Sequence, residues 1–382
     1  GVRRGAVPGE MVSRTAGADA LYMARALGLA ERGRGRTSPN PMVGAVVVDE
    51  EGVVVGRGAH ERAGGPHAEI LALADAGTRA RGGTLYCTLE PCIHTGRTGP
   101  CAPRVVEAGI RRAVIAGVDP NPLVAGRGLD HLREHGVEVS IGVLEDDAAR
   151  LNRPFFMCIS RGRPLTTVKV ALTLDGCVST APGVRSKLTG EAADRAIHRE
   201  RAEVDAIGIG SETLLADDPL LTARGVFRHR PLIRVVFDRR LRTPPGCRLL
   251  STQASGPVII MTLASSVRRA RVHASTLVDA GARLEQFDDP LSSCDFLRGA
   301  VERLSASGIL SLVVEGGPTL HRAFWDARLV DRMQLYVTPA WAGSQGVRWD
   351  AVPLGTIAGI RDGMVKPIGG DVLIEGYVHG AD

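Results

Sequence analysis

The sequence predicts an α/β protein built from two domains. Its 382 residues exceed the size of one ordinary domain. Both halves contain short runs of β-branched and aliphatic residues, separated by segments in which apolar residues recur at helical spacing. Between the halves, an acidic run is followed by a basic, proline-containing run near residues 146–163, which places the domain boundary there.

The N-terminal half is expected to form a sheet with a hairpin at its start. Residues 43–48 and 53–58 are valine-rich runs joined by a polar segment that contains a glycine, the pattern of a hairpin. The elements that follow are predicted from apolar spacing: a helix over 67–80, a buried strand over 84–89, a short helix over 102–108 and a strand over 112–118.

The C-terminal half is expected to contain a mainly parallel, covered sheet, because its strands alternate with helical segments. It opens with a strand over 165–172. Further β-rich stretches are found at 204–210, 232–238, 258–263, 309–314 and 333–339.

The domain limits follow from these patterns. Residues 1–17 carry three arginines and no periodic apolar face, so a disordered extension is predicted there. We expect the first domain to span 18–150, a linker to span 151–163 and the second domain to span 164–382.

The chemistry of the first domain is indicated by His67, Glu69, Cys92 and Cys101. In zinc deaminases one imidazole and two thiolates hold the metal, the fourth position binds water, and a carboxylate that is not a ligand moves protons. His67, Cys92 and Cys101 fit the three ligand positions. Glu69 fits the catalytic proton carrier, and both His67 and Glu69 fall in the first turn of the predicted helix.

Some features of this pattern leave alternatives. Eight residues separate Cys92 from Cys101, whereas two separate the cysteines in the common deaminase signature. His94, in that insertion, is a rival ligand, and contact with the substrate is its alternative role. Cys87 lies in the middle of a predicted strand and is interpreted as a core residue. A second His-x-Glu, at 198–200, has no Pro-Cys after it and is interpreted as a solvated helix face.

Cysteine content and charge limit the cellular setting and the partners. The seven cysteines are an odd number, and no signal peptide or long apolar run is evident, so a cytoplasmic protein with free thiols and no membrane contact is expected. The net charge of +5 admits a nucleic-acid deaminase as a minor alternative. However, the basic residues are spread along the chain and aromatics are only 4%, too few for a base-stacking surface. A small-molecule substrate is therefore favoured.

Two glycine-containing turns in the second half could bind a nucleotide. Residues 208–213 contain two of the three glycines of a dinucleotide fingerprint, but Thr213 replaces the third, so a simple turn is favoured. Residues 315–320 (EGGPTL) follow a buried strand and open a helix, where backbone N–H groups can approach a phosphate. This second turn is the better candidate, although strand-Gly-Gly-helix turns are common.

Five motifs in the first half occur together and in order: 37–44 (TSPNPMVG), 67–69 (HAE), 88–92 (TLEPC), 96–98 (GRT) and 119–128 (DPNPLVAGRG). Three more follow in the second half, at 169–176 (KVALTLDG), 214–224 (LLADDPLLTAR) and 314–320 (VEGGPTL). From about residue 19 to the C-terminus, the chain resembles the bifunctional deaminase and reductase family of riboflavin biosynthesis. The long spacing between the cysteines is that family's form of the zinc motif.

This resemblance implies a cytidine-deaminase-like α/β/α domain followed by a dihydrofolate-reductase-like α/β domain. It implies Zn²⁺ for hydrolytic deamination of 2,5-diamino-6-(5-phosphoribosylamino)pyrimidin-4-one, a pyrimidine ribotide phosphate. NADPH would then reduce the ribose of 5-amino-6-(5-phosphoribosylamino)uracil to the ribityl chain. The resemblance also suggests a homo-oligomer.

Residue roles in both domains are implied by position in the family motifs. Asn40 matches a substrate-binding residue, although shaping its Pro-Asn-Pro turn is the alternative. Arg97 and Thr98 could hold the ribose phosphate. In the second domain, the cofactor contacts are Ala171, Thr213, Asp217, Gly317, Pro318, Thr319 and Leu320, and the substrate contacts are Arg201, Leu221, Arg224 and Glu315.

One segment departs from the family pattern. Where the family has Ser-x-Trp-Ile-Thr, this chain reads VRSKLT over 184–189, so the tryptophan expected over the cofactor is missing. A deaminase whose reductase-like half is inactive or altered is therefore an alternative. The sequence does not identify the proton donor of the reduction, and Lys169 is a hypothesis for that role.

Overall fold

The computed structural model describes residues 8–93, 99–122, 124–184, 186–289, 291–351 and 360–378, with side chains from residue 17 onward. Contacts divide the chain into two compact units, Gly1–Arg161 and Gly162–Asp382. No helix in the described part of the chain is long and apolar enough to cross a membrane.

The first unit is built on a sheet of five strands in the order β2-β1-β3-β4-β5. The central strand β3 is antiparallel to β1 and parallel to β4. The expected hairpin is formed by β1 and β2. The strands are β1 (Gly44–Val48), β2 (Val54–Ala59), β3 (Thr84–Cys87), β4 (Arg112–Ile115) and β5 (Glu138–Ile141).

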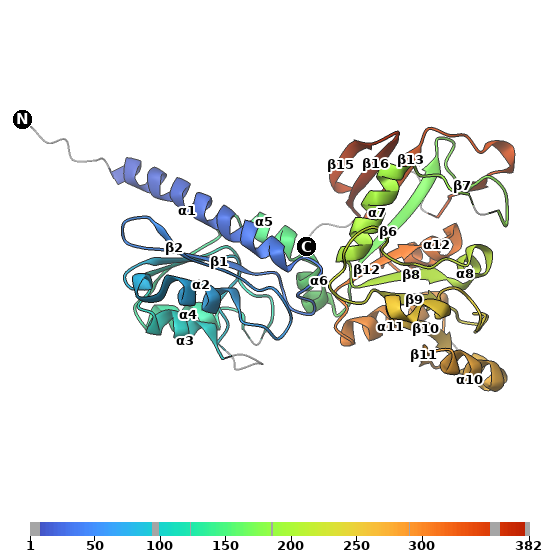
Figure 1. Cartoon of the computed structure of the whole chain (residues 1–382), viewed down its shortest axis with the longest axis horizontal. Helices are drawn as coiled ribbons and strands as arrows, with labels where there is room; N and C mark the ends of the chain where they lie inside the picture. The colour runs from blue at the N-terminus through green and yellow to red at the C-terminus, as the bar shows by residue number, and fades with distance from the viewer. Residues whose placement is uncertain are drawn as a thin grey trace, which may run out of the picture. The chain divides into compact units, whose positions relative to one another are not determined.

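Helices cover both faces of this sheet, which confirms the predicted α/β/α arrangement (Figure 1). One face packs against α2 (Ala68–Ala76), α3 (Cys101–Glu107) and α4 (Arg127–Glu134). Cys87 is fully buried in this core, as expected for a structural cysteine. The other face packs against α1 (Pro8–Ala30) and α5 (Glu145–Leu151), and the 3₁₀ turns of the unit are η1 (Glu31–Gly33) and η2 (Gly77–Ala80).

Two segments differ from the domain limits that the sequence predicts. Helix α1 begins at Pro8, within the segment 1–17 for which a disordered extension is predicted; residues 1–7 lie outside the described part. The predicted linker at 151–163 is largely occupied by α6 (Arg153–Arg161), whose Phe155 is buried in the first unit. Pro154 is the second residue of α6, where a proline sacrifices no intrahelical hydrogen bond.

The second unit contains a sheet of nine strands in the order β11-β10-β9-β8-β12-β6-β13-β16-β15. The seven strands from β11 to β13 are parallel, as expected, and β16 and β15 extend the sheet in antiparallel fashion. They are β6 (Leu165–Thr173), β8 (Ala206–Gly210), β9 (Ile233–Phe237), β10 (Val258–Leu263), β11 (Ala282–Phe287), β12 (Ser311–Glu315), β13 (Arg332–Thr338), β15 (Arg361–Ile368) and β16 (Asp371–Tyr377).

A small second sheet pairs β7 (Cys177–Ser179) with β14 (Val347–Arg348). Two cores lie on opposite faces of the large sheet, and α7 packs on Tyr336 and Leu373. The helices of the unit are α7 (Glu191–Glu203), α8 (Ser211–Asp217), α9 (Ala264–Arg269), α10 (Arg271–Asp279), α11 (Ser293–Ala306) and α12 (Pro318–Asp326), with 3₁₀ turns η3 (Leu250–Ser255) and η4 (Gly343–Gln345).

Candidate metal centre and reductase cavity

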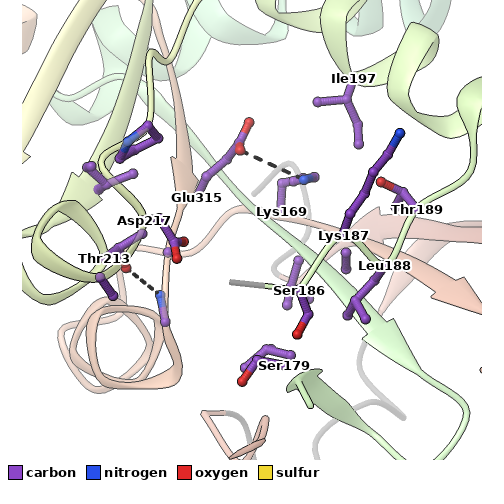
Figure 2. Close-up of a pocket in the computed structure, with 18 of the residues that line it drawn as sticks. Lys169, Ser179, Ser186, Lys187, Leu188, Thr189, Ile197, Thr213, Asp217 and Glu315 are labelled. Atoms are coloured by element: carbon purple, nitrogen blue, oxygen red, sulfur yellow. Dashed lines mark hydrogen bonds and ion pairs between the residues drawn. The ribbon is translucent and has the colours of Figure 1, made fainter. Parts of the chain in front are cut away.

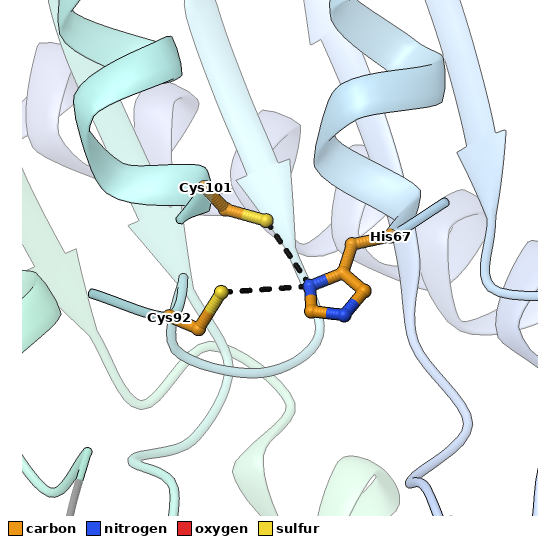
Figure 3. Close-up of side chains that lie close together, drawn as sticks. All are labelled: His67, Cys92 and Cys101. Atoms are coloured by element: carbon orange, nitrogen blue, oxygen red, sulfur yellow. Dashed lines mark hydrogen bonds between the residues drawn. The ribbon is translucent and has the colours of Figure 1, made fainter. Parts of the chain in front are cut away.

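The predicted zinc ligands converge in the first unit (Figure 3). The Nδ1 atom of His67 lies 3.2 Å from Sγ of Cys101 and 3.5 Å from Sγ of Cys92. Among the described residues, these three form the only group of His, Cys, Asp or Glu side chains whose ligand atoms gather within 4.8 Å of one another. One imidazole and two thiolates, with the fourth position left for water, match the donor set of a catalytic zinc site.

The backbone explains why the three side chains meet. His67 is the N-cap of α2, and Cys101 is the first residue of α3. The carbonyl of Cys92, a few residues past the end of β3, accepts hydrogen bonds from the N–H groups of Cys101 and Ala102, both at 3.0 Å. The long segment between the cysteines is thus closed at its base, so its length does not separate the two thiols.

Close packing of α2 on β2 fixes the helix that carries His67. A Cβ atom on Gly58 would lie 2.0 Å from the carbonyl oxygen of Ala68, and one on Gly56 would lie 2.1 Å from that of Ala72. Only glycine permits this approach. The two glycines of β2 therefore set the position of the metal-binding end of α2.

The two thiols share one proton when no metal is bound. A hydrogen bond from Cys101 lowers the pKa of Cys92, and the same hydrogen bond raises the pKa of Cys101. The hydrogen bond to Cys92 raises the pKa of His67. Zinc would replace these protons, because the metal binds thiolates and neutral imidazole.

Glu69 lies beside this centre without belonging to the ligand group. It is 3% exposed in the first turn of α2, and burial raises the pKa of its carboxyl group. A raised pKa suits a group that must both accept and deliver a proton near neutral pH. Glu69 is thus buried and lines the same cavity as His67 and Cys92, and its role as proton carrier stays a prediction.

A cavity of about 400 Å³ adjoins the metal centre. Its lining includes Asn40, Glu69, Asp119 and Asn121. His60, which the sequence analysis missed, also lines it: Nδ1 lies 3.0 Å from the carbonyl oxygen of Pro66, and Nε2 lies 3.1 Å from Nδ2 of Asn40. His94, Arg97 and Thr98 fall outside the described residues.

These contacts fix the orientation of the Asn40 amide. A carbonyl can only accept, so Nδ1 of His60 carries the hydrogen, and burial lowers the pKa of this imidazole. In the neutral ring Nε2 is then an acceptor, and Nδ2 of Asn40 donates to it. The amide oxygen of Asn40 is left as the acceptor of this side chain.

Helix α6 lines part of the cavity, and the residue before it, Asn152, binds the chain near Asn40. The amide of Asn152 accepts a hydrogen bond from the N–H of Met42 at 2.7 Å and donates one to its carbonyl at 2.8 Å. Phe155 lines the cavity directly. Both residues fall in the segment 151–163, for which the sequence predicts a linker and no site residue.

A larger cavity of about 780 Å³ lies in the second unit (Figure 2). It brings together nearly all the residues implied for cofactor and substrate: Ala171, Arg201, Thr213, Asp217, Leu221, Arg224, Glu315, Gly317 and Pro318. Thr319 and Leu320 line an adjoining cavity of about 570 Å³. Thr213 and Gly317 border both cavities, and the N–H of Gly317 donates to Oγ1 of Thr213 at 3.1 Å.

Glu315 is the electrostatic centre of the larger cavity. Its carboxylate accepts hydrogen bonds from Arg201 at 2.9 and 2.7 Å and lies 3.8 Å from Nζ of Lys169. Burial opposes ionisation, but the charges of Arg201 and Lys169 prevail and lower the pKa of Glu315 to about 2. This group is therefore a permanent carboxylate, able to accept hydrogen bonds but not to supply a proton.

The segment that departs from the family pattern forms one side of this cavity. Ser186, Lys187, Leu188 and Thr189 line it, across from Thr213 and Asp217 (Figure 2). The Lys187 side chain is 72% exposed and lies 3.3 Å from Asp194. Arg185 falls outside the described residues.

Comparison with known proteins supports both halves of the chain. Residues 17–117 match the cytidine and deoxycytidylate deaminase zinc-binding region, and residues 164–371 match the RibD C-terminal domain. The riboflavin biosynthesis protein RibD of Aquifex aeolicus is 40% identical over 85% of this chain and 88% of its own length. The chain belongs to the RibD family. The Escherichia coli RibD is 39% identical over 90% of this chain and 92% of its own.

Solved RibD structures have the same two-domain fold. Acinetobacter baumannii RibD superposes with a TM-score of 0.82 at 35% identity, covering 95% of this chain and 99% of its own. A Thermotoga maritima deaminase/reductase gives 0.80 at 31% identity, with the same coverage. The predicted fold and a bifunctional deaminase and reductase are thereby confirmed. A deaminase with an inactive second half is not favoured, because RibD relatives match across both domains.

Proposed function

We propose that this chain catalyses two successive steps of riboflavin biosynthesis. It hydrolyses the 2-amino group of 2,5-diamino-6-(5-phosphoribosylamino)pyrimidin-4-one, and it reduces the ribose of the resulting 5-amino-6-(5-phosphoribosylamino)uracil with NADPH. The Thermotoga maritima structure, described as a diaminohydroxyphosphoribosylaminopyrimidine deaminase and 5-amino-6-(5-phosphoribosylamino)uracil reductase, supports this pair of reactions. The observation that carries the proposal is that each unit contains its own equipped cavity, one with the ligand triad and Glu69 and one centred on Glu315.

In the deaminase site, His67, Cys92 and Cys101 hold the zinc ion. Bound zinc lowers the pKa of its water to near neutrality and so supplies the nucleophile. Glu69 accepts the proton of that water and delivers it to the departing ammonia, a role suited to its raised pKa. His60 takes one of the two N–H groups of the Asn40 amide and so fixes the orientation of that amide; its oxygen is then placed to accept a hydrogen bond from a donor on the pyrimidine.

In the reductase site, bound NADPH would supply the hydride that reduces the anomeric carbon of the sugar. Glu315, as a permanent carboxylate, accepts hydrogen bonds from sugar hydroxyls, and Arg201 holds it in place. Arg224 contributes positive charge on the substrate side of the cavity. Lys169, next to Glu315, is the candidate for the proton that accompanies the hydride.

The cofactor is proposed to run between the two adjoining cavities, across the border formed by Thr213 and Gly317. The glycine turn at 316–317 is the proposed phosphate site near the start of α12, because Gly317 is the N-cap of this helix and the nearest side chain, that of Thr213, carries a hydroxyl that can also contact a phosphate. The farther cavity suits the 2′-phosphate of NADPH. It is lined by the arginines Arg239, Arg240, Arg242 and Arg269 and by the serines Ser265 and Ser266.

The setting of the enzyme is also part of the proposal. A cytoplasmic location, formation of a homo-oligomer and the absence of nucleic-acid binding are proposed from the cysteine content, the family and the scattered charge. The substrates are small phosphorylated pyrimidines.

One assay series tests the function. The purified protein is analysed for zinc, for ammonia release from the diaminopyrimidine ribotide, and for NADPH oxidation that depends on that release. Glu69→Gln should keep zinc and lose ammonia release by at least about a hundredfold, as expected for loss of a general acid–base group. It should still oxidise NADPH when the deaminated intermediate is supplied. Zinc-loaded wild-type protein that releases no ammonia would refute the proposal.

A further inference from the structure

A buried histidine connects two walls of the reductase cavity. His321, in α12, is fully buried, and both of its ring nitrogens have partners. Nε2 lies 3.3 Å from the carbonyl oxygen of Val314, and Nδ1 lies 3.0 Å from Nε1 of Trp349. The contact with Trp349 joins residues 28 positions apart, which precede and follow β13 in the sequence.

The chemistry of the partners determines the state of the ring. A backbone carbonyl only accepts, and an indole N–H only donates. His321 must therefore carry its hydrogen on Nε2 and accept on Nδ1, which is possible only for the neutral imidazole. Burial lowers the pKa of His321 to about 4, in agreement with this state.

The two partners belong to opposite sides of the cavity. Val314 directly precedes Glu315 and the glycine turn, so the Nε2 contact ties α12 to the strand that delivers these groups. Trp349 follows β14. Its backbone N–H donates to the carbonyl of Gly176 at 2.9 Å, at the turn before β7. The β7–β14 pair lines the cavity through Val178, Ser179 and Val347.

We propose that His321 and Trp349 are positioning residues of the reductase, which fix the β7–β14 wall relative to the glycine turn that receives the cofactor. This inference rests on the proposed reductase function. Neither residue is among those that line the cavity, so they act through the wall and the turn. Loss of their hydrogen bond is expected to let the wall shift and to misplace sugar and nicotinamide relative to each other.

The test uses full-length protein with zinc bound. Trp349→Phe removes the indole N–H but keeps an aromatic side chain, and Trp341→Phe is the matched control because Trp341 is 73% exposed. We expect Trp349→Phe to lower kcat/KM for NADPH-dependent reduction of supplied intermediate about three- to tenfold, the range expected for one partly buried hydrogen bond. Ammonia release, and NADPH affinity measured by fluorescence titration, should change less than about twofold.

Two substitutions at His321 separate positioning from mere stability. Asn places its amide oxygen near the position of Nδ1, so His321→Asn can still accept from Trp349, whereas His321→Leu cannot. We expect kcat/KM for reduction to be closer to the wild-type value in His321→Asn than in His321→Leu. This difference between the two variants should persist at temperatures well below the melting temperature of each. Equal kinetics for all variants, or losses that follow melting temperature alone, would overturn the proposal.

The outcome is distinguishable from failure of the proposed function. If wild-type protein does not oxidise NADPH with supplied intermediate, the reductase assignment fails. The hydrogen bond remains measurable in that case, because the contribution of Trp349 to the fluorescence of wild type and of His321→Leu is obtained by subtracting the signal of the matching Trp349→Phe proteins, but the positioning role would be rejected.

Discussion

Asn152 holds the main chain of Met42 through both its N–H and its carbonyl, across 110 residues of sequence. Asn40 lies two residues before this contact. Asn152→Ala would leave both backbone groups of Met42 without these partners, at a cost of about 1–3 kcal/mol. We expect a higher KM for the diaminopyrimidine ribotide and an unchanged reduction of supplied intermediate, measured in separate assays.

Asn152→Asp is the matched control for this prediction. It keeps an acceptor for the Met42 N–H but loses the donor to the carbonyl. Its KM should fall between those of wild type and Asn152→Ala. Identical kinetics for wild type and Asn152→Ala would show that this contact does not position the substrate-binding turn.

Removal of zinc should separate the two activities. Chelation is expected to abolish ammonia release and to leave reduction of supplied intermediate intact. Because Cys101 has a raised pKa in the metal-free site, zinc uptake must displace a proton, and apparent zinc affinity should weaken as pH falls. Calorimetric titration in buffers of different ionisation enthalpy measures this proton release. Uptake without proton release would contradict the shared-proton description of the two thiols.

Gly58 should tolerate no side chain. In Gly58→Ala the new Cβ must displace the Ala68 carbonyl at the start of α2, which moves His67 and Glu69. We expect lower zinc content and ammonia release reduced by at least about tenfold, since small displacements of catalytic groups have large effects. Gly28→Ala is the control, because a Cβ there meets nothing within 4 Å and alanine favours the helix. Full zinc occupancy and activity in Gly58→Ala would refute this account.

Glu315→Gln should disable the reductase by removing the charge between Arg201 and Lys169. Breaking a buried ion pair costs about 3–5 kcal/mol, so both stability and kcat for reduction should fall. Arg322→Ala, which breaks an exposed pair with Asp326, should change stability by less than about 1 kcal/mol.

The pKa of Glu315, at about 2, also predicts how the wild-type reductase responds to pH. Glu315 stays ionised throughout the range from about pH 5 to about pH 8, so it should cause no pH dependence of reduction there.

His321 should make stability pH-dependent. Its folded-state pKa of about 4 lies below the ordinary 6.5, so its contribution is complete above about pH 6.5 and is lost as pH falls toward 4. The loss amounts to at most about 3 kcal/mol in the free energy of unfolding. Lys169 and Glu315 act on the same ring, but Glu315 stays charged in this window. Urea titrations at pH 7 and pH 4.5 should show a smaller pH effect in His321→Asn than in wild type.

The sequence was sufficient to predict the placement of residues that lie at the ends of regular helices and strands. The ligand triad and Glu69 could be predicted because a helix start and a strand end place them by short-range geometry. The parallel strands of the second unit were predictable because both of their faces are buried and they read as continuous apolar runs.

Other elements gave no such signal. Strand β15 is largely exposed and therefore lacks an apolar period, and β14 is two residues long. Helix α6 lies where a linker is predicted, because its proline and its arginines are typical of linkers. Only the structure shows that Phe155 lines the cavity and that Asn152, just before the helix, binds Met42. His60 and His321 belong to no recognisable sequence motif. Their roles depend on hydrogen bonds to Asn40 and Trp349, which are distant in the sequence.

The paired hydrogen bonds from Cys101 and Ala102 to the carbonyl of Cys92 have an evolutionary consequence. Because they close the base of the intervening segment, insertions or deletions within it leave the spacing of the two sulfur ligands unchanged. A deaminase with this arrangement can therefore change the length and sequence of the segment between its cysteines while the positions of its metal ligands stay constant.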